Sequence, residues 1–332
     1  MRKAFIDYSS LASSVVCCRC APFQKSEIAT AIKKQLKKII CCVGDGGNDV
    51  AMIQKGDVGI GIEGKEGNQA SLASDFSISE FKTLAPLILW TGRLSYIRTS
   101  LLANFVIHRG LIIATIQFFY TVMYSYTTIP IYNGYLMLGY ATVFTCLPVF
   151  SLTFDEDVSY RQVLEYPILY KNIQNGKELS IRTFLGWAWL SIFQGATLLV
   201  VSIIVFENSF FELVTITFTS LILIEMLNIA TSVRKWHYAI KVSIAMSFII
   251  YGCCLVFLRH FFMLSEITWQ FGLKVLLITA AAWIPVKVYD IIKNLVSPTL
   301  AKKIRKEEKS KNLLNTLPSS NNTIHGHEST KD

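Results

Sequence analysis

Long apolar stretches fill the sequence after residue 100, and they constrain its fold more than any other feature. Six of them reach the length at which a helix crosses a bilayer, about 20 residues. They lie at residues 101–122, 132–154, 183–206, 211–233, 238–258 and 267–291. The whole chain is 52% hydrophobic with a mean hydropathy of +0.43, which is too apolar for a soluble domain of 332 residues. We therefore predict an α-helical membrane bundle of six transmembrane helices over residues 101–291.

The distribution of lysine and arginine predicts the orientation of this bundle. Six spans place both termini on one side of the membrane. The connections at 125–131 and 207–212 carry no Lys or Arg, and the connection at 259–266 carries only Arg259. Positively charged connections stay in the cytosol, so the opposite connections and both termini are expected there. Residues 292–332 are predicted to be a basic, disordered cytosolic tail, with binding of that tail to anionic lipid as the alternative.

A glycine-rich acidic turn marks the first part of the chain. Residues 39–43 are apolar and predict a buried parallel strand, and the glycines between positions 44 and 47 allow the backbone to approach a ligand closely. Asp45 and Asp49 lie four residues apart around this turn, and helix is expected to follow. Carboxylates at the carboxyl end of a parallel strand suit Mg²⁺, which prefers oxygen ligands. The alternative is an ordinary turn with solvated acids.

The pattern of expected strands and helices in the rest of residues 1–80 indicates a partial α/β domain. Strands are expected at 14–18, 39–43 and 58–62, with helices at 22–38 and 48–55 between them. Residues 81–100 are expected to form a polar stalk helix that leads into the first span.

Several motifs in order carry a family resemblance. Residues 18–25 (CRCAPFQK), a basic amphipathic helix and the run GDGGND resemble the phosphorylation domain of P-type ATPases. Residues 61–71, 105–110 and 148–152 are similar to type IV P-type ATPases, the phospholipid flippases. Among these, the His-Arg pair at 108–109 and PVFSL at 148–152 resemble the Golgi and endosomal subgroup that works without an accessory β subunit.

The resemblance implies a site for ATP and Mg²⁺. It makes residues 1–80 the C-terminal part of a HAD-like phosphorylation domain. It assigns Asp45 and Asp49 to Mg²⁺, Lys25 to the phosphoryl oxygens, Arg19 to the nucleotide phosphates, and Asn48 with Asp49 to phosphate binding. The sequence contains no Asp-Lys-Thr-Gly motif, which supplies the phosphorylated aspartate, and no Asp-Gly-Glu-Thr motif. We therefore expect a C-terminal fragment of a flippase that has no ATPase activity alone.

Ionisable residues inside the spans indicate the cargo. The first two spans contain no Asp or Glu, whereas a Ca²⁺ site needs about six oxygen ligands. His108 and Arg109 in the first span, with Glu225 and Asn228 in the fourth, are expected to line a lipid path, because charges in spans are commonly functional. A cation-transporting P-type ATPase and a non-catalytic truncated membrane protein are the alternatives. Phospholipid and ATP are the expected partners, nucleic acid is not, and Golgi or endosomal membranes are the expected location.

Overall fold

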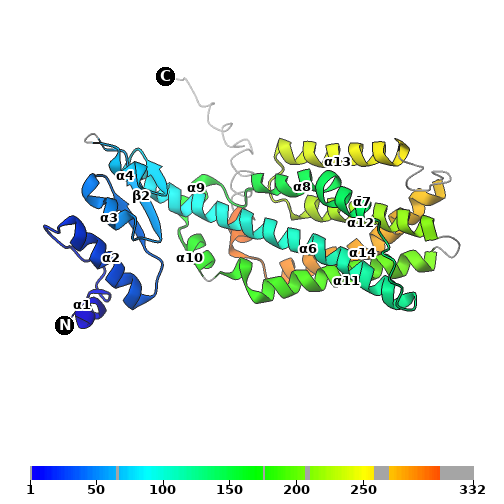
Figure 1. Cartoon of the computed structure of the whole chain (residues 1–332), viewed down its shortest axis with the longest axis horizontal. Coiled ribbons are helices and arrows are strands. Elements are labelled where there is room, and N and C mark those ends of the chain that lie inside the picture. Colours follow the sequence, from blue (N-terminus) through cyan, green and yellow to red (C-terminus); the bar gives the residue numbers. More distant parts are fainter. Residues whose placement is uncertain (1, 65–66, 175, 206–209, 258–268, 307–332) are drawn as a thin grey trace, which may run out of the picture. The chain divides into compact units, whose positions relative to one another are not determined.

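The chain folds into two compact units, Met1–Thr91 and Gly92–Asp332. The structure, a computed structural model, describes residues 2–64, 67–174, 176–205, 210–257 and 269–306 (Figure 1). The first unit contains the sheet and the second contains the helical bundle. Most of the predicted cytosolic tail, from residue 307 onward, lies outside the described residues.

The first unit is built on a parallel sheet of three strands in its described part. Their order is β1 (Cys41–Gly44), β2 (Val58–Ile62) and β3 (Phe76–Ile78). Helices α3 (Val50–Ile53) and α4 (Gln69–Leu72) connect them. Helix α4 packs so closely on β2 that a Cβ atom at Gly61 would lie 2.5 Å from the carbonyl oxygen of Ala70. A glycine is therefore required there, because any side chain would clash with the backbone of α4.

Several details of this unit differ from the sequence prediction. Residues 14–18 do not form a strand: they are exposed, and they make no ladder hydrogen bond to β1. An apolar, β-branched segment becomes a strand only when a neighbouring strand satisfies its backbone groups. The strand predicted at 39–43 begins at Cys41 instead, and α4 and β3 were not anticipated.

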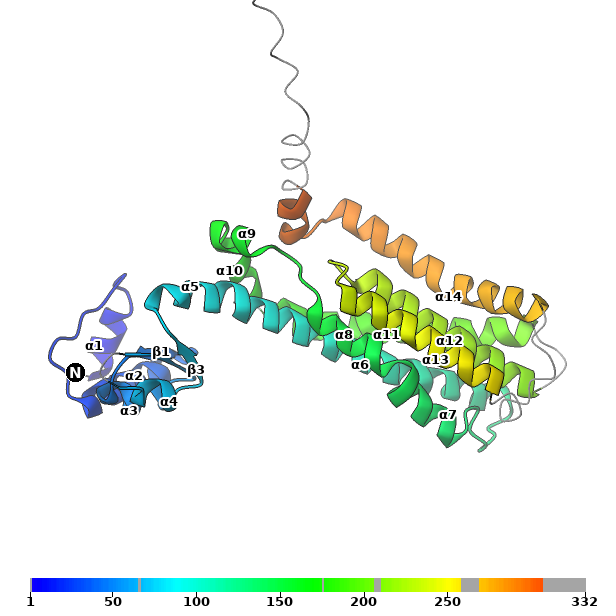
Figure 2. The same ribbon diagram turned by 90° about the horizontal axis from the view of Figure 1, so that it is seen from above.

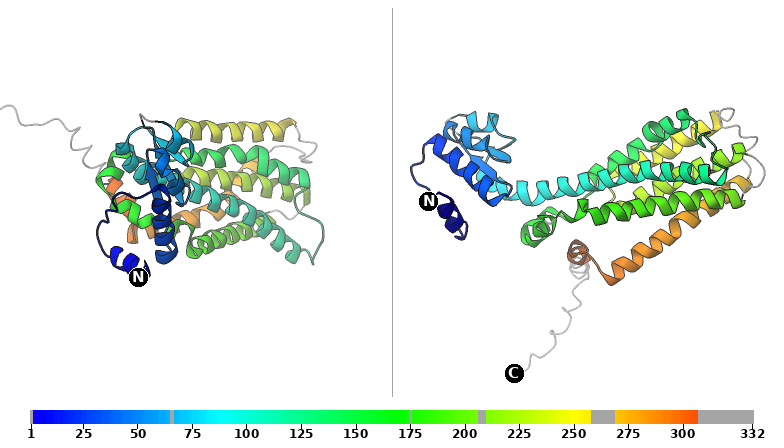
Figure 3. Two further views of the ribbon diagram at one scale, coloured as in Figure 1. Left: turned by 60° about the vertical axis from the view of Figure 1, so that its left-hand side comes forward. Right: turned by 60° about the horizontal axis from the view of Figure 1, so that its bottom comes forward.

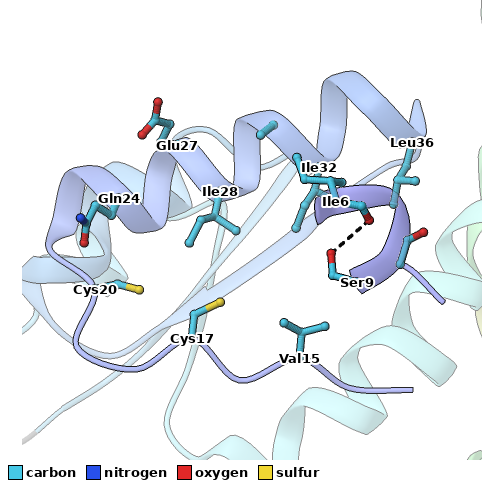
Figure 4. Close-up of a pocket in the computed structure, with 12 residues that line it drawn as sticks. Ile6, Ser9, Val15, Cys17, Cys20, Gln24, Glu27, Ile28, Ile32 and Leu36 are labelled. Atoms are coloured by element: carbon cyan, nitrogen blue, oxygen red, sulfur yellow. Dashed lines mark hydrogen bonds between the residues drawn. The ribbon is translucent and has the colours of Figure 1, made fainter. Parts of the chain in front are cut away.

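Residues 15–20 instead border an apolar groove. The groove has a volume of about 530 Å³ and lies between this segment, α1 (Arg2–Ser9) and α2 (Pro22–Leu36). Figure 4 shows Ile28, Ile32 and Leu36 on the face of α2 that lines it, opposite Cys17 and Val15. Helix α2 starts with Pro22 and ends at Leu36, and the following residue, Lys37, adopts a left-handed conformation with φ of 50°. The start at Pro22 places Lys25 in the first turn.

Six helical stretches in the described residues are long and apolar enough to cross a membrane, which confirms the predicted bundle. They are Phe81–Met123, Gly134–Phe154, Ile181–Val205, Glu212–Ser232, Tyr238–Phe257 and Trp269–Val296. The first stretch includes the predicted stalk residues, with a π-helical segment at Leu87–Gly92 directly after Pro86 and then α6 (Arg93–Met123). The last stretch continues past the predicted end at residue 291.

Helix α12 (Phe210–Ser232) is the centre of the bundle. Within its most apolar segment, 78% is buried inside the protein, a larger share than in any other of the six stretches. Helix α11 (Ile181–Val205) packs along α6 and against α12, and α14 (Trp269–Val296) packs on both α11 and α12. Figures 2 and 3 show α11 running beside α6, whereas α13 (Tyr238–Phe257) packs against the stretch Gly134–Phe154. Polar side chains on α12 therefore face protein.

The second stretch is not one regular helix. It consists of α7 (Gly134–Gly139), the π-helical η4 (Tyr140–Phe144), α8 (Cys146–Ser151) and the 3₁₀ turn η5 (Leu152–Phe154). Pro148 accounts for the break, because proline has no N–H and its ring clashes with the carbonyl group four residues earlier. Backbone carbonyl groups near the break become available to side chains of other helices.

Short helices follow this stretch before the next one begins. They are α9 (Tyr160–Glu165), α10 (Ile168–Gln174) and the 3₁₀ turn η6 (Lys177–Leu179).

Candidate functional site

The acidic turn lies directly after β1, as the sequence predicts. Asp45 follows the last strand residue and is exposed, whereas Asp49 ends the 3₁₀ turn η1 (Gly47–Asp49) and is buried. A Cβ atom at Gly44 would lie 2.3 Å from the Cβ atom of Asp49. The absence of a side chain at position 44 therefore lets Asp49 pack against the end of the strand.

Lys25 joins this turn from the first turn of α2. Its Nζ atom donates a hydrogen bond of 2.8 Å to Oδ1 of Asp49, which lies 24 residues later in the chain. This hydrogen bond raises the pKa of Lys25 above its ordinary value. Lys25 therefore stays protonated at neutral pH, and the edge of the sheet carries one cation beside two carboxylate groups.

The other two predicted residues of this site are placed differently. Asn48 is exposed on the same turn as Asp45 and Asp49. Arg19 is exposed on the segment before α2, and among the described residues no hydrogen bond or ion pair joins it to Lys25 or to the turn. Its φ of 55° lies in the left-handed region, which costs a residue with a Cβ atom about 1–2 kcal/mol.

Gln69 is a residue of this turn that the site prediction did not include. A Cβ atom at Gly47 would lie 2.1 Å from Oε1 of Gln69, so the Gln69 side chain reaches the turn from α4. Gln69 lies within residues 61–71, a segment that carries the family resemblance. That segment is the only signal in the sequence that could have pointed to it.

The donor set at the turn fits Mg²⁺. Asp45 and Asp49 supply hard oxygen ligands, and Mg²⁺ commonly binds one or two carboxylates together with waters and substrate phosphates. No group of three or more His, Cys, Asp or Glu side chains that could hold a metal ion occurs in the described residues. The turn can therefore take part in a metal site that a phosphate ligand completes.

A second polar cluster lies inside the bundle, around His108 of α6. Nδ1 of His108 lies 2.7 Å from Oγ of Ser191 on α11, and that hydroxyl group donates to the carbonyl oxygen of Trp187 at 2.8 Å. Nε2 of His108 lies 3.3 Å from Nδ2 of Asn228 on α12. His108 has no solvent exposure, so its ring bridges three helices in the interior of the bundle.

Glu225 of α12 belongs to the same cluster and is fully buried. Its Oε1 accepts a hydrogen bond of 3.0 Å from the hydroxyl group of Tyr140 and lies 3.8 Å from Nε2 of His108. One turn along α12, Asn228 donates to Oε1 of Gln194 at 3.0 Å. The structure therefore brings together His108, Glu225 and Asn228, three of the four residues predicted for the lipid path.

Arg109, the fourth residue, contacts the broken second stretch instead. Its Nη1 donates to the carbonyl oxygen of Ala141 at 3.2 Å and to Oγ1 of Thr145 at 2.9 Å. The Thr145 hydroxyl donates in turn to the carbonyl oxygen of Tyr140 at 2.6 Å. A half-buried guanidinium group therefore meets irregular backbone, which membrane proteins tolerate where it is buried or lines a cavity.

Sequence reasoning missed the uncharged members of this cluster. Tyr140, Ser191 and Gln194 contribute hydrogen bonds to it, and Thr145 accepts one from Arg109. Nothing in their local sequence distinguishes them from packing residues, because their partners lie on other helices.

These observations define an integral membrane protein that also carries a small α/β unit built on a parallel sheet. A family sequence model described as "Phospholipid-translocating P-type ATPase C-terminal" matches residues 71–299. The chain belongs to this family, as the motifs of the sequence indicate, and it is a multi-pass membrane protein.

Curated relatives agree with this assignment. "Probable phospholipid-transporting ATPase IIB" of Danio rerio is 44% identical over 295 residues, which are 89% of this chain and 26% of that protein. Its counterpart of the same name in Homo sapiens is 42% identical over 306 residues, 89% of this chain and 27% of that protein. "Phospholipid-transporting ATPase NEO1" of Saccharomyces cerevisiae is 42% identical over 306 residues, 90% of this chain and 26% of that protein. The chain thus spans about a quarter of the length of these relatives.

Proposed function

We propose that this chain is the C-terminal part of an ATP-driven flippase that moves phospholipid toward the cytosolic leaflet. The observation that carries the proposal is the polar cluster of the bundle. It contains one carboxylate, Glu225, together with His108 and neutral side chains, and Arg109 lies at the helix break. A phospholipid presents a phosphate group that a guanidinium group can bind, whereas a cation pump needs several oxygen ligands.

In this proposal the turn after β1 serves phosphoryl transfer from ATP to an aspartate of the full-length protein. Asp45 and Asp49 would hold Mg²⁺, which neutralises charge on the phosphoryl group when it is bound. Lys25, kept protonated by Asp49, would bind the phosphoryl oxygens. Asn48 would orient the phosphate, and Arg19 would bind the nucleotide phosphates after its exposed side chain moves.

Orientation, location and independence from a β subunit are further parts of the proposal. The Lys and Arg distribution supports cytosolic termini. The resemblance of residues 108–109 and 148–152 to the β-subunit-independent subgroup supports Golgi or endosomal membranes. Expression of the full-length protein without any accessory subunit should therefore give an active, correctly located enzyme.

Reconstitution of the full-length protein in liposomes tests the cargo. We expect ATP-dependent movement of fluorescent phosphatidylserine or phosphatidylethanolamine, and no movement in an Asp45→Asn control. ATP-driven uptake of Ca²⁺ or Na⁺ without lipid movement would instead establish a cation pump.

A further inference from the structure

Several buried polar atoms among the described residues of the bundle have no hydrogen-bond partner, and one of them belongs to a carboxyl group. Oε2 of Glu225 is this atom, and the Glu225 side chain has no solvent exposure. The other carboxyl oxygen, Oε1, accepts only from the neutral hydroxyl group of Tyr140. We propose that Glu225 and His108 form a buried proton-binding site, in which one proton is held on the carboxyl group of Glu225 beside a neutral imidazole.

The hydrogen bonds of His108 identify its tautomer. The Ser191 hydroxyl proton is used by the carbonyl oxygen of Trp187, so Oγ of Ser191 acts as the acceptor for Nδ1–H of His108. Nε2 therefore carries a lone pair, and it faces the donor Nδ2 of Asn228 at 3.3 Å. A neutral His108 satisfies both hydrogen bonds of the ring, to Ser191 and Asn228, and it adds no positive charge that could balance an ionised Glu225.

A proton fits this site better than a metal cation does. The amide oxygens of Gln194 and Asn228 accept hydrogen bonds from each other's NH₂ groups, at 3.0 Å for Gln194 Oε1 and 3.4 Å for Asn228 Oδ1. Glu225 and the Tyr140 hydroxyl are then the remaining oxygen ligands of the cluster. Metal cations such as Ca²⁺ and Mg²⁺ require far more ligands. A proton needs a single acceptor atom, and Oε2 is available for it.

The surrounding charged groups leave Glu225 without an ion pair to a permanent cation in the described residues. Arg109 is directed at Ala141 and Thr145, and α11 contributes the uncharged Ser191 and Gln194 near the cluster. The titratable or charged groups on the elements around α12 are Arg93, Tyr96, Arg98, His108, Arg109 and Tyr120 on α6, Tyr140 on η4, Cys146 on α8, Arg182 on α11, Tyr238, Lys241, Tyr251, Cys253 and Cys254 on α13, and Lys274, Lys287, Tyr289, Asp290 and Lys293 on α14. Of these, His108 and Tyr140 lie against Glu225. In the competing arrangement Glu225 is ionised, and its charge is balanced by a protonated His108 at 3.8 Å or by Arg109 at longer range.

The proton site does not depend on the proposed flippase activity, because it concerns the chain in its resting membrane state. The test is infrared spectroscopy of the full 332-residue chain in lipid nanodiscs over a pH series. At neutral pH we expect a protonated-carboxyl band that disappears in Glu225→Gln and persists in Glu212→Gln, a matched control at the other end of α12. In Glu225→Asp the band should shift in frequency.

Stability supplies the second measurement. Above the ordinary carboxyl pKa, Glu225 keeps its proton in the folded state and releases it in the unfolded state. The free energy of unfolding should therefore fall as pH rises. The equilibrium constant for unfolding in mixed micelles should increase about ten-fold per pH unit until the folded site also titrates. Glu225→Gln should abolish this component, since its amide cannot ionise.

An ionised-carboxylate band at neutral pH that is lost in Glu225→Gln would overturn the proposal in favour of a Glu225 charge balanced by His108 or Arg109. The same conclusion follows if wild type and Glu225→Gln share one pH dependence. Because neither measurement uses ATP or lipid transport, a failure of the flippase proposal would leave these results unchanged.

Discussion

At the turn after β1, the position of the Asp49 carboxylate depends on Gly44, a residue without a side chain. Gly44 lies under Asp49, and the Cβ atoms of the two residues would be 2.3 Å apart if position 44 held alanine. Neither atom can move by side-chain rotation, so the turn itself would have to shift.

We expect Gly44→Ala to lower the amount of phosphoenzyme that the full-length protein forms from ATP. Overpacking of this kind costs about 1–3 kcal/mol and would displace Asp49 from Lys25. Gly46→Ala is the matched control, because a Cβ atom there meets nothing within 4 Å and its φ of −128° suits any residue. Equal phosphoenzyme levels in the two variants would show that the contact is unimportant.

The two carboxylates themselves are the second target at this scale. Asp45→Asn or Asp49→Asn in the full-length protein should abolish phosphoenzyme formation at limiting Mg²⁺, because each removes a negative charge that would hold the cation. Labelling with radioactive ATP measures the result. Wild-type phosphoenzyme levels in either variant would mean that the acid is only structural.

At the scale of elements, Asp57 connects α2 with the sheet. Its Oδ1 lies 2.6 Å from Nζ of Lys33, and its Oδ2 accepts a hydrogen bond of 3.0 Å from the backbone N–H of Ile40. The Lys33 hydrogen bond, with that of Ile40, holds the pKa of Asp57 below its ordinary value. The start of β1 is thus tied to α2 by one side chain.

We expect this connection to weaken in acid. A lowered pKa means that the stabilisation is present above the ordinary carboxyl pKa and is lost as pH falls through the lowered value. Thermal unfolding of the first unit within the full-length protein, followed over pH, should show this loss in wild type but a smaller one in Lys33→Ala. Lys34→Ala, one residue further along α2, should behave like wild type, and an equal effect of both substitutions would contradict the assignment.

A buried ion pair ties α6 to the segment after the second stretch. Arg93 donates two hydrogen bonds, of 2.7 and 2.5 Å, to the carboxylate of Asp157, and each side chain is only 5% exposed. By contrast, the Lys235–Glu156 pair nearby has side chains that are 65% and 31% exposed. The two pairs differ mainly in burial.

Removing one partner should therefore destabilise the protein much more for the buried pair than for the exposed pair. Asp157→Asn leaves the Arg93 charge buried without its carboxylate and should destabilise the bundle by about 3–5 kcal/mol. Glu156→Gln should cost less than about 1 kcal/mol, as is usual for exposed pairs. Unfolding in mixed micelles measures both variants, and similar losses would show that burial does not govern the Arg93–Asp157 pair.

For the whole molecule, the printed 332 residues should insert into membranes without Mg²⁺-dependent ATPase activity. Phosphoryl transfer needs a nucleophile in line with the γ-phosphate, and Asp45 and Asp49 cannot fill that role while they hold Mg²⁺. Flotation with liposomes and phosphate release measure the two properties. Steady turnover that disappears in Asp45→Asn would indicate an autonomous phosphohydrolase.

Some features of this protein depend only on local sequence, and these were predicted correctly. A span is identified by about 20 successive apolar residues, because a bilayer acts on each segment separately. The strand that ends before Asp45 was likewise predictable within two residues, since apolar residues followed by glycines mark it directly. Residues 14–18 have the same local character and were predicted wrongly, because a strand also needs a partner that its own sequence does not contain.

The arrangement of both sites was decided by tertiary structure. Lys25 meets Asp49 across 24 residues, and His108 meets Asn228 across 120 residues. The sequence indicated His108, Glu225 and Asn228 individually because polar groups are rare in spans, but it could not indicate Tyr140, Ser191 or Gln194. Which neutral side chains complete a buried cluster depends on how the helices pack. Helix packing brings together residues that are far apart in the sequence, so the local sequence around each one does not indicate its partner.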